Sequence, residues 1–188
     1  MVSTYQAISG AGKTFRTWPE MVDNVIPYIG GEDEKSENEP LKIWGEVQEG
    51  TNGKRIVNRE LPVISAQCLR VAASDGHMAA VCVGFSKKPT KEAILEKWAN
   101  FTNERQRLEL PSAPKPFLQY FEDPSRPQTR LDRDFERGFG ISIGRLREDR
   151  ILDWRFVCLS HNTIRGAAGG GILSAELLCA KGYIAHRG

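Results

Sequence analysis

The chain has 188 residues, of which 40% are hydrophobic and 27% are charged, and its formal net charge is +2 at pH 7. This composition is typical of a globular chain with a sizeable core and excludes an intrinsically disordered or membrane-embedded one. Basic residues are interleaved with acidic ones, as in RLDRDFERG at residues 130–138, so no stripe for nucleic acid is indicated. Because the N-terminus lacks the layout of a signal peptide, we expect a cytoplasmic protein with neither nucleic-acid nor membrane partners.

The four cysteines, Cys68, Cys82, Cys158 and Cys179, are far apart and form no C-x-x-C pair. A structural zinc site needs clustered ligands, so we expect no metal. Three of these cysteines lie in apolar runs, where a cysteine usually serves as a small buried hydrophobic residue.

In chain order, residues 2–9 (VSTYQAIS) are predicted to form a strand that runs into a glycine turn. A loop or turn is predicted at residues 24–31. Residues 32–50 carry apolar side chains at near-helical spacing, which predicts a helix with Pro40 near its first turns and Gly50 after its end.

The apolar runs at residues 64–73 and 77–85 predict two further strands. Residues 90–102 (TKEAILEKWANFT) place apolar and charged residues on opposite faces, which is typical of an amphipathic helix. Thr90 is its predicted N-cap.

Residues 110–130 are proline-rich and predict an extended surface connection. Residues 139–148 and 151–160 predict a strand hairpin, and residues 161–184 predict a glycine-rich turn into a helix that ends near Gly182. This order of elements predicts an α+β fold with a mostly antiparallel mixed sheet covered by helices.

Arg70 and His77 are polar residues in strands that are otherwise apolar. A buried guanidinium is costly unless an anion meets it, and its planar fork suits a carboxylate. A nearby histidine can move a proton near neutral pH. The alternative is a surface arginine and a loop histidine without a role.

Three weaker signals accompany this pair. Gln6 ends a strand before glycines that permit close approach to a ligand, although an ordinary strand-to-turn junction explains it equally well. Glu39 and Lys42 lie three apart on one helix face, where the alternative is a surface ion pair. Residues 159–170 (LSHNTIRGAAGG) lead into a helix whose free N–H groups suit a polar ligand, unless the glycines serve close packing alone.

In this order, TYQAISGAG, EPLK, RVAASDGH and NTIRGAAGG resemble the aspartate-β-semialdehyde dehydrogenases, specifically the archaeal and fungal branch. The stretches NVIPYIGGEDEK, LPSAPKP and RPQTRLDR resemble the same branch, and the likeness runs from Val2 to about Ile184. It implies a domain like the C-terminal domain of glyceraldehyde-3-phosphate dehydrogenase. It further implies NADPH-dependent reduction of aspartyl phosphate to aspartate semialdehyde, with phosphate release through a cysteine thioester, in lysine, threonine, methionine and isoleucine biosynthesis.

The resemblance also implies roles for individual residues. By motif, His77 matches the acid–base residue and Gln6 the glutamine that orients the intermediate. Arg70 matches the residue that binds the substrate carboxylate, Glu39 the one that binds its amino group, and Lys42 the one that holds phosphate. Each residue type suits the group assigned to it.

The same motifs imply that Ser9 and Gly10 contact the NADP cofactor and that Asn162 lies near its nicotinamide carboxamide. The family's enzymes are roughly twice as long, which is consistent with two domains. They carry a glycine-rich cofactor domain and a nucleophilic cysteine in an NCST-like motif before the YQA strand. Neither is present here, so the sequence predicts a C-terminal fragment without a nucleophile that is inactive alone.

In this interpretation residues 1–165 are the truncated catalytic and dimerisation domain. Residues 166–188 are a helix that would pack on the absent NADP-binding domain. The implied partners are aspartate semialdehyde or aspartyl phosphate, phosphate, and further copies of the chain in a homodimer or tetramer. Two alternatives remain: a related acyl-CoA reductase of the malonyl-CoA reductase type, or a non-catalytic dimerisation module on the same fold.

Overall fold

A computed structural model describes residues 1–50 and 53–184. Its strands are β1 (Val2–Gln6), β2 (Val25–Ile26), β3 (Glu46–Gly50), β4 (Gly53–Val57), β5 (Ala66–Val71), β6 (His77–Val83), β7 (Leu118–Phe121), β8 (Ile141–Glu148) and β9 (Trp154–Ser160). Seven of them form one sheet in the order β2-β5-β1-β6-β9-β8-β7, and β3 and β4 form a separate hairpin. The pairs β1–β5 and β7–β8 are parallel and the others antiparallel, which confirms the predicted α+β fold with a mostly antiparallel mixed sheet.

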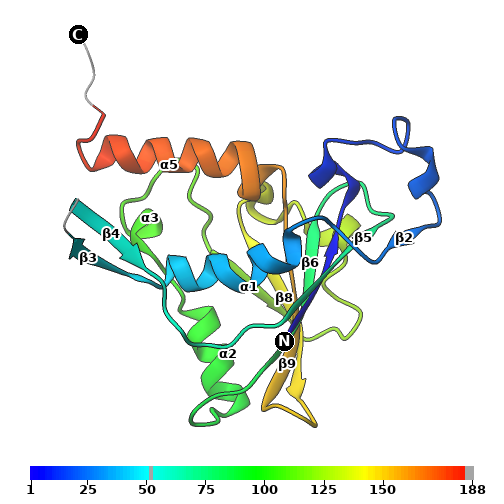
Figure 1. Ribbon diagram of the computed structural model, residues 1–188, viewed down its shortest axis with the longest axis horizontal. Coiled ribbons are helices and arrows are strands. Elements are labelled where there is room, and N and C mark those ends of the chain that lie inside the picture. Colours follow the sequence, from blue (N-terminus) through cyan, green and yellow to red (C-terminus); the bar gives the residue numbers. More distant parts are fainter. Residues whose placement is uncertain (51–52, 185–188) are drawn as a thin grey trace.

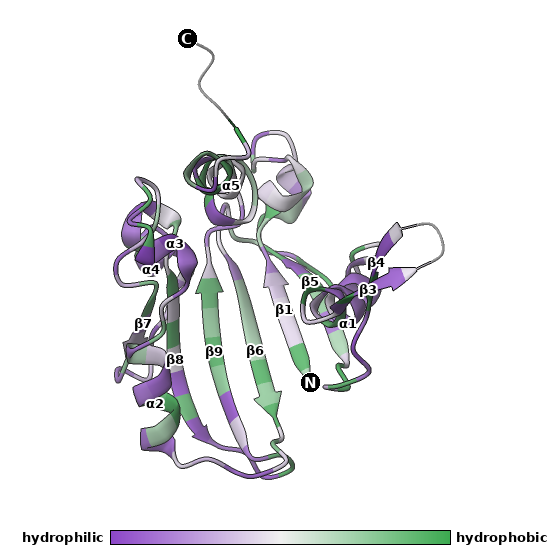
Figure 2. Cartoon of the chain, turned by 90° about the vertical axis from the view of Figure 1, so that its left-hand side faces the viewer, coloured by the Kyte–Doolittle hydropathy of each residue, from purple (hydrophilic) through white to green (hydrophobic). Residues whose placement is uncertain are grey.

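The α-helices are α1 (Glu32–Ile43), α2 (Lys91–Ala99), α3 (Glu104–Arg107), α4 (Thr129–Asp132) and α5 (Gly169–Ala180). Short turns of 3₁₀-helix occur at η1 (Ile8–Ala11), η2 (Pro19–Met21) and η3 (Phe135–Gly138), and η4 (Ile164–Ala168) is a π-helical turn. Figure 1 shows α1, α2 and α5 on one side of the sheet, and Figure 2 shows apolar residues along β6 and β9 beneath them. Among the described residues, no helix is long and apolar enough to cross a bilayer.

Acidic side chains fasten α1 to the outer edge of β5. Asp33 Oδ1 accepts the backbone N–H of Cys68 at 2.7 Å, and Glu37 Oε1 accepts that of Ala66 at 3.0 Å. Four residues of helix rise about 6 Å, close to the roughly 6.7 Å spanned by two residues of strand, so the two carboxylates match the two N–H groups. The antiparallel match places the first turn of α1 beside the end of β5 that carries Arg70.

The predicted helix at residues 32–50 was too long. Three acidic residues in its first turn favour a start at Glu32, and α1 ends at Ile43, so Pro40 lies near its end rather than its beginning. Residues 46–50 form β3 instead, where Val47 lies opposite Ile56 in the antiparallel hairpin. These cross-strand pairs stabilise the extended conformation over the helical one.

Most of the other predicted elements are confirmed, including the β8–β9 hairpin and the cap of α2, where the Thr90 hydroxyl accepts the N–H of Ala93 at 3.2 Å. The proline-rich connection was only partly right, because its residues 118–121 form β7 and pair with β8. The final helix ends at Ala180, two residues before the predicted Gly182. The predicted segment 166–188 begins inside η4, and its residues 185–188 lie outside the described residues.

Candidate active site

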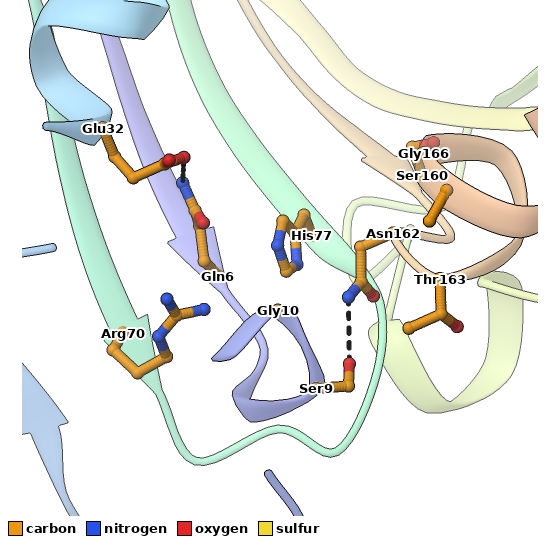
Figure 3. A pocket seen from close by; sticks show the side chains of 11 residues that line it. Gln6, Ser9, Gly10, Glu32, Arg70, His77, Ser160, Asn162, Thr163 and Gly166 are labelled. Carbon is orange, nitrogen blue, oxygen red and sulfur yellow. Dashed lines mark hydrogen bonds between the residues drawn. The ribbon is translucent and has the colours of Figure 1, made fainter. Parts of the chain in front are cut away.

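A cavity of about 470 Å³ lies where β1 and β5 end and β6 begins (Figure 3). The strand register builds it, because Gln6 lies opposite Arg70 in the parallel pair and His77 opposite Ser160 in the antiparallel one. The lining residues are Gln6, Ser9, Gly10, Glu32, Arg70, His77, Ser160, Asn162, Thr163, Gly166 and Ala167. Six of the eight sequence-predicted site residues are therefore brought together here.

Arg70 is buried, with 7% of its surface exposed, and its guanidinium faces the cavity in Figure 3. Its Nη1 donates to the Ala7 carbonyl at 2.8 Å. Burial lowers the pKa of the guanidinium, and the nearby Glu32 carboxylate partly opposes this effect. Arginine stays charged even so, which leaves a buried cation at the cavity wall that is suited to a carboxylate.

His77 is held by the backbone of the β1–η1 turn. Its Nδ1 accepts the N–H of Ala7 at 3.1 Å, so in the neutral ring the proton is on Nε2. Burial, and then the positive charge of Arg70, lowers the pKa of this imidazole to about 4. In this chain His77 is therefore neutral at pH 7, and its Nε2 lies near Gly10.

Glu32 is the anionic counterpart of Arg70. Its Oε1 accepts from Lys35 Nζ at 2.9 Å, and its Oε2 accepts from Gln6 Nε2 at 3.2 Å. The hydrogen bond from Lys35, followed by the one from Gln6, lowers the pKa of Glu32 despite partial burial, so the side chain is a carboxylate at pH 7. The cavity thus presents a fixed cation and a fixed anion to one ligand.

Gly10 lies against both polar side chains. A Cβ atom built at this position would lie 2.8 Å from Arg70 Nη1 and 2.9 Å from His77 Nε2. Both distances are shorter than real Cβ contacts, so no larger residue fits without moving Arg70 and His77.

Asn162 links two turns of the site. Its Nδ2 donates to Ser9 Oγ at 2.9 Å, and its Oδ1 accepts the backbone N–H of Gly76 at 2.9 Å. The predicted grouping of Ser9, Gly10 and Asn162 around one pocket therefore exists in the structure, whereas the cofactor contact assigned to them stays a prediction.

The structure does not bring Glu39 and Lys42 into the cavity. Both are exposed on the second half of α1. The E-x-x-K spacing occurs twice in this helix, at Glu32 with Lys35 and again seven positions later at Glu39 with Lys42. Seven residues turn a helix almost twice and advance it about 10.5 Å, so both pairs share a face but the second lies far from the strand ends.

Sequence reasoning thus missed Glu32, although the first E-x-x-K pair was a readable signal. It also missed Ser160, Thr163, Gly166 and Ala167, which line the cavity without a motif of their own. In the part of the chain that the structure describes, no group of three or more histidine, cysteine, aspartate or glutamate residues could hold a metal ion.

The strand ends of one mixed sheet thus surround a single cavity with arginine, glutamate, histidine and glutamine side chains. Residues 1–165 match the family described as "Semialdehyde dehydrogenase, dimerisation domain". The chain belongs to this family.

The relatives and the solved structure that the chain resembles all carry one name. The chain is 46% identical to the aspartate-semialdehyde dehydrogenase of Schizosaccharomyces pombe, over 97% of the chain and 51% of that protein. It is 43% identical to the enzyme of that name from Archaeoglobus fulgidus, over 94% of the chain and 49% of that protein. The crystal structure of aspartate semialdehyde dehydrogenase with NADP from Candida albicans matches with a TM-score of 0.83 and 41% identity, covering 97% of this chain and 51% of that one. The chain spans about half the length of the curated relatives it matches.

Proposed function

We propose that the chain is the substrate-binding and dimerisation half of an aspartate-semialdehyde dehydrogenase. This enzyme reduces aspartyl phosphate with NADPH to aspartate semialdehyde and phosphate. The observation that carries the proposal is the pairing of the Arg70 cation with the Glu32 anion at one cavity that also holds His77. An α-amino acid carries a carboxylate and an ammonium group close together, so fixed charges of opposite sign complement it.

Each polar side chain of the cavity has a separate role in binding or reaction. The guanidinium of Arg70 binds the substrate carboxylate in its fork, and the carboxylate of Glu32 accepts hydrogen bonds from the ammonium group. Gln6, which donates to Glu32, has its amide positioned to orient the group that reacts. His77 acts as the acid–base residue through Nε2, because Nδ1 is engaged by Ala7.

We propose NADP as the cofactor of the assembled enzyme, in keeping with the NADP in the relative from Candida albicans. Gly10, Gly166 and Ala167 are small residues in the cavity lining, and they leave room for a flat ring. The Asn162 amide, which donates one N–H to Ser9, has a second N–H for a carboxamide. When bound, the cofactor supplies the hydride, while this chain positions its reactive end.

The test is a chimera in which this chain replaces the 186 matched residues of the fission-yeast relative. We expect phosphate-dependent NADPH formation from aspartate semialdehyde. The isolated chain, which has no cysteine in the NCST-like context of the family's nucleophile, should show none. A soluble, folded chimera without this activity, or an isolated chain with it, contradicts the proposal.

The two E-x-x-K pairs of α1 give a matched comparison in the same chimera. Glu32→Gln removes the anion at the cavity, and we expect kcat/KM for aspartate semialdehyde to fall about 10²-fold, since a hydrogen bond to a charged group is worth about 1.5–3 kcal/mol. Glu39→Gln changes an exposed residue of the same type, and kcat/KM should stay within about twofold. If instead Glu39→Gln lowers kcat/KM strongly and Glu32→Gln does not, Glu39 binds the substrate amino group, as the EPLK motif indicated.

We also propose that the chain dimerises through the face of the sheet opposite α1 and α2. The register places Tyr5, Leu69 and Met78 side by side on this face, away from the cavity, and all three remain partly exposed. Such an apolar strip over neighbouring strands is typical of an interface between subunits.

Sedimentation tests the interface. The chain should sediment as a dimer or a higher assembly, and Met78→Glu should give a monomer, because a charge would be buried within the apolar strip. Ile151→Glu, at an apolar residue that is 83% exposed in the β8–β9 turn, is the matched control and should leave the assembly intact. A clean monomer of the unmodified chain at high concentration would disprove the interface.

Helix α5 completes the proposed domain organisation. Its Ile172 is 56% exposed and its Leu178 42% exposed, so apolar surface of this helix faces outward. We propose that residues from 166 onward pack in the full enzyme on the cofactor domain, which would cover this surface.

A further inference from the structure

The segment that follows α4 contacts the turn in front of His77, although neither its sequence nor the proposed function gives it a role. Arg133 Nη1 donates to Ser74 Oγ at 2.9 Å and to the Asp75 carbonyl at 3.2 Å. The side chain is mostly covered, with 23% of its surface exposed. One guanidinium thus binds two consecutive residues of the turn at residues 73–76.

The stem of Arg133 also packs on the glycine that ends this turn. Gly76 has φ of +92°, which L-residues with a side chain rarely adopt. A Cβ at Gly76 would lie 3.2 Å from both Arg133 Cβ and Leu159 Cδ1. Meanwhile the N–H of Gly76 donates to Asn162 Oδ1. The turn at residues 73–76 is therefore contacted by Arg133 through Ser74, Asp75 and Gly76, and by Asn162 through the N–H of Gly76.

The same turn fixes the group that orients the imidazole. The backbone N–H groups of Ile8 and Ser9 donate to the carbonyls of Ala73 and Ser74, at 2.9 and 3.2 Å. These bonds hold the β1–η1 turn, whose Ala7 N–H donates to His77 Nδ1. A shift of residues 73–76 would displace His77 directly through the chain and indirectly through Ala7.

We infer that Arg133 is a positioning residue for His77, acting by locking the turn at residues 73–76 against the β1–η1 turn. The inference rests on the proposed function only in taking His77 as the acid–base residue. Arg133 touches neither the cavity nor the proposed ligand, so its effect passes through the backbone.

Asp134, the residue after Arg133, lies near Arg133 and a second loop of the site. Asp134 has one carboxylate oxygen 3.9 Å from Arg133 Nε and the other 3.6 Å from Nε2 of the buried His161. His161 Nδ1 in turn accepts the backbone N–H of Ile164 at 3.4 Å. Consecutive residues after α4 thus contact the turn before His77 and the loop after β9 that carries Asn162.

The test is a titration of His77 by NMR in the ¹⁵N-labelled 188-residue chain, which contains three histidines. The charged groups that affect the His77 ring are Arg70, Glu32 and Asp75, and Arg70 lowers its pKa after the larger effect of burial. The unmodified chain should give a pKa of about 4 with Nδ1 as the acceptor. In Arg133→Met the ring gains solvent and moves from Arg70, so its pKa should rise by about one pH unit or more toward 6.5.

Two matched variants separate positioning from a general loss of stability. Arg133→Lys keeps a cationic donor on a long stem and should restore most of the unmodified titration. Arg130→Met removes an exposed arginine from α4, the helix immediately before Arg133 in the chain, and should leave the titration of His77 unchanged. A folded Arg133→Met chain whose His77 keeps its pKa and its ring ¹⁵N shifts would overturn the inference.

If Arg133→Met does not fold, Ser74→Ala tests the same role of Arg133. Ser74 is exposed, so this variant removes one acceptor of Arg133 without opening the core. We expect amide exchange at Ser9 to accelerate about fivefold or more, and unchanged exchange overturns the inference. Both readouts are independent of catalysis, so an inactive chimera with these His77 shifts would refute the proposed function alone.

Discussion

Gly10→Ala should abolish the activity of the chimera, with kcat/KM falling at least about 10³-fold. The added methyl group would lie within 2.9 Å of both Arg70 Nη1 and His77 Nε2, so one or both must leave their present positions. Losing a carboxylate contact and an aligned acid–base residue together costs at least about 4 kcal/mol, which corresponds to this factor. Steady-state kinetics with aspartate semialdehyde and phosphate measure it.

Gly12→Ala is a poor control for this substitution, because φ at Gly12 is +67° and any side chain there is strained. Gly84→Ala is the better one, since Gly84 is exposed and a Cβ there would make one ordinary contact, 3.6 Å from Leu152 Cδ2. It should leave kcat/KM unchanged. If Gly10→Ala retains full activity, Arg70 and His77 do not act together at this cavity.

Arg70→Met should raise KM for aspartate semialdehyde and lower kcat/KM by about 10²–10⁴-fold. Two hydrogen bonds from a guanidinium to a carboxylate are worth about 1.5–3 kcal/mol each, and the variant also removes one of the two donors to the Ala7 carbonyl, the other being the N–H of Gly10. Arg70→Lys should recover only part of the loss, because an ammonium cannot form the planar fork. Arg150→Met, at an exposed arginine in the β8–β9 turn, is the control.

The His77 titration gives this prediction a second readout in the chain itself. The charge of Arg70 is the second-largest cause of the low pKa of His77, after burial. Removing that charge should therefore raise the pKa of His77, even where no substrate binds. Normal kcat/KM in Arg70→Met would show that the substrate carboxylate is bound elsewhere.

The polar residues in apolar strands were the most reliable guide to the site. Arg70 and His77 were found because each breaks a run of apolar residues, and strand alternation then places Arg70 on the face that holds Gln6. Glu32 was not found, because a helical repeat of seven residues makes two E-x-x-K pairs equivalent in sequence. Only the tertiary contact between α1 and the edge of β5 decides which pair reaches the cavity.

Two of the strands that sequence reasoning missed are stabilised by partners distant in the sequence or by tertiary pairing. Residues 46–50 continue the polar composition of the helix before them, so the sequence does not mark the change to a strand. Their strand conformation depends on pairing with residues 53–57. Strand β7 is surrounded by prolines, and its conformation depends on the parallel pairing with β8. Such pairings are not encoded in local propensity, which is weaker for strands than the packing around them.

The carboxylates of Asp33 and Glu37 also bear on the behaviour of the chain in concentrated solution. Open strand edges recruit strands from other molecules, and natural proteins cover or charge them to prevent aggregation. In this chain β2 pairs with residues 70–71 of β5, and the N–H groups of Ala66 and Cys68, which β2 does not reach, are bound by α1. The helix that delivers Glu32 to the cavity therefore also keeps this edge from seeding intermolecular sheets.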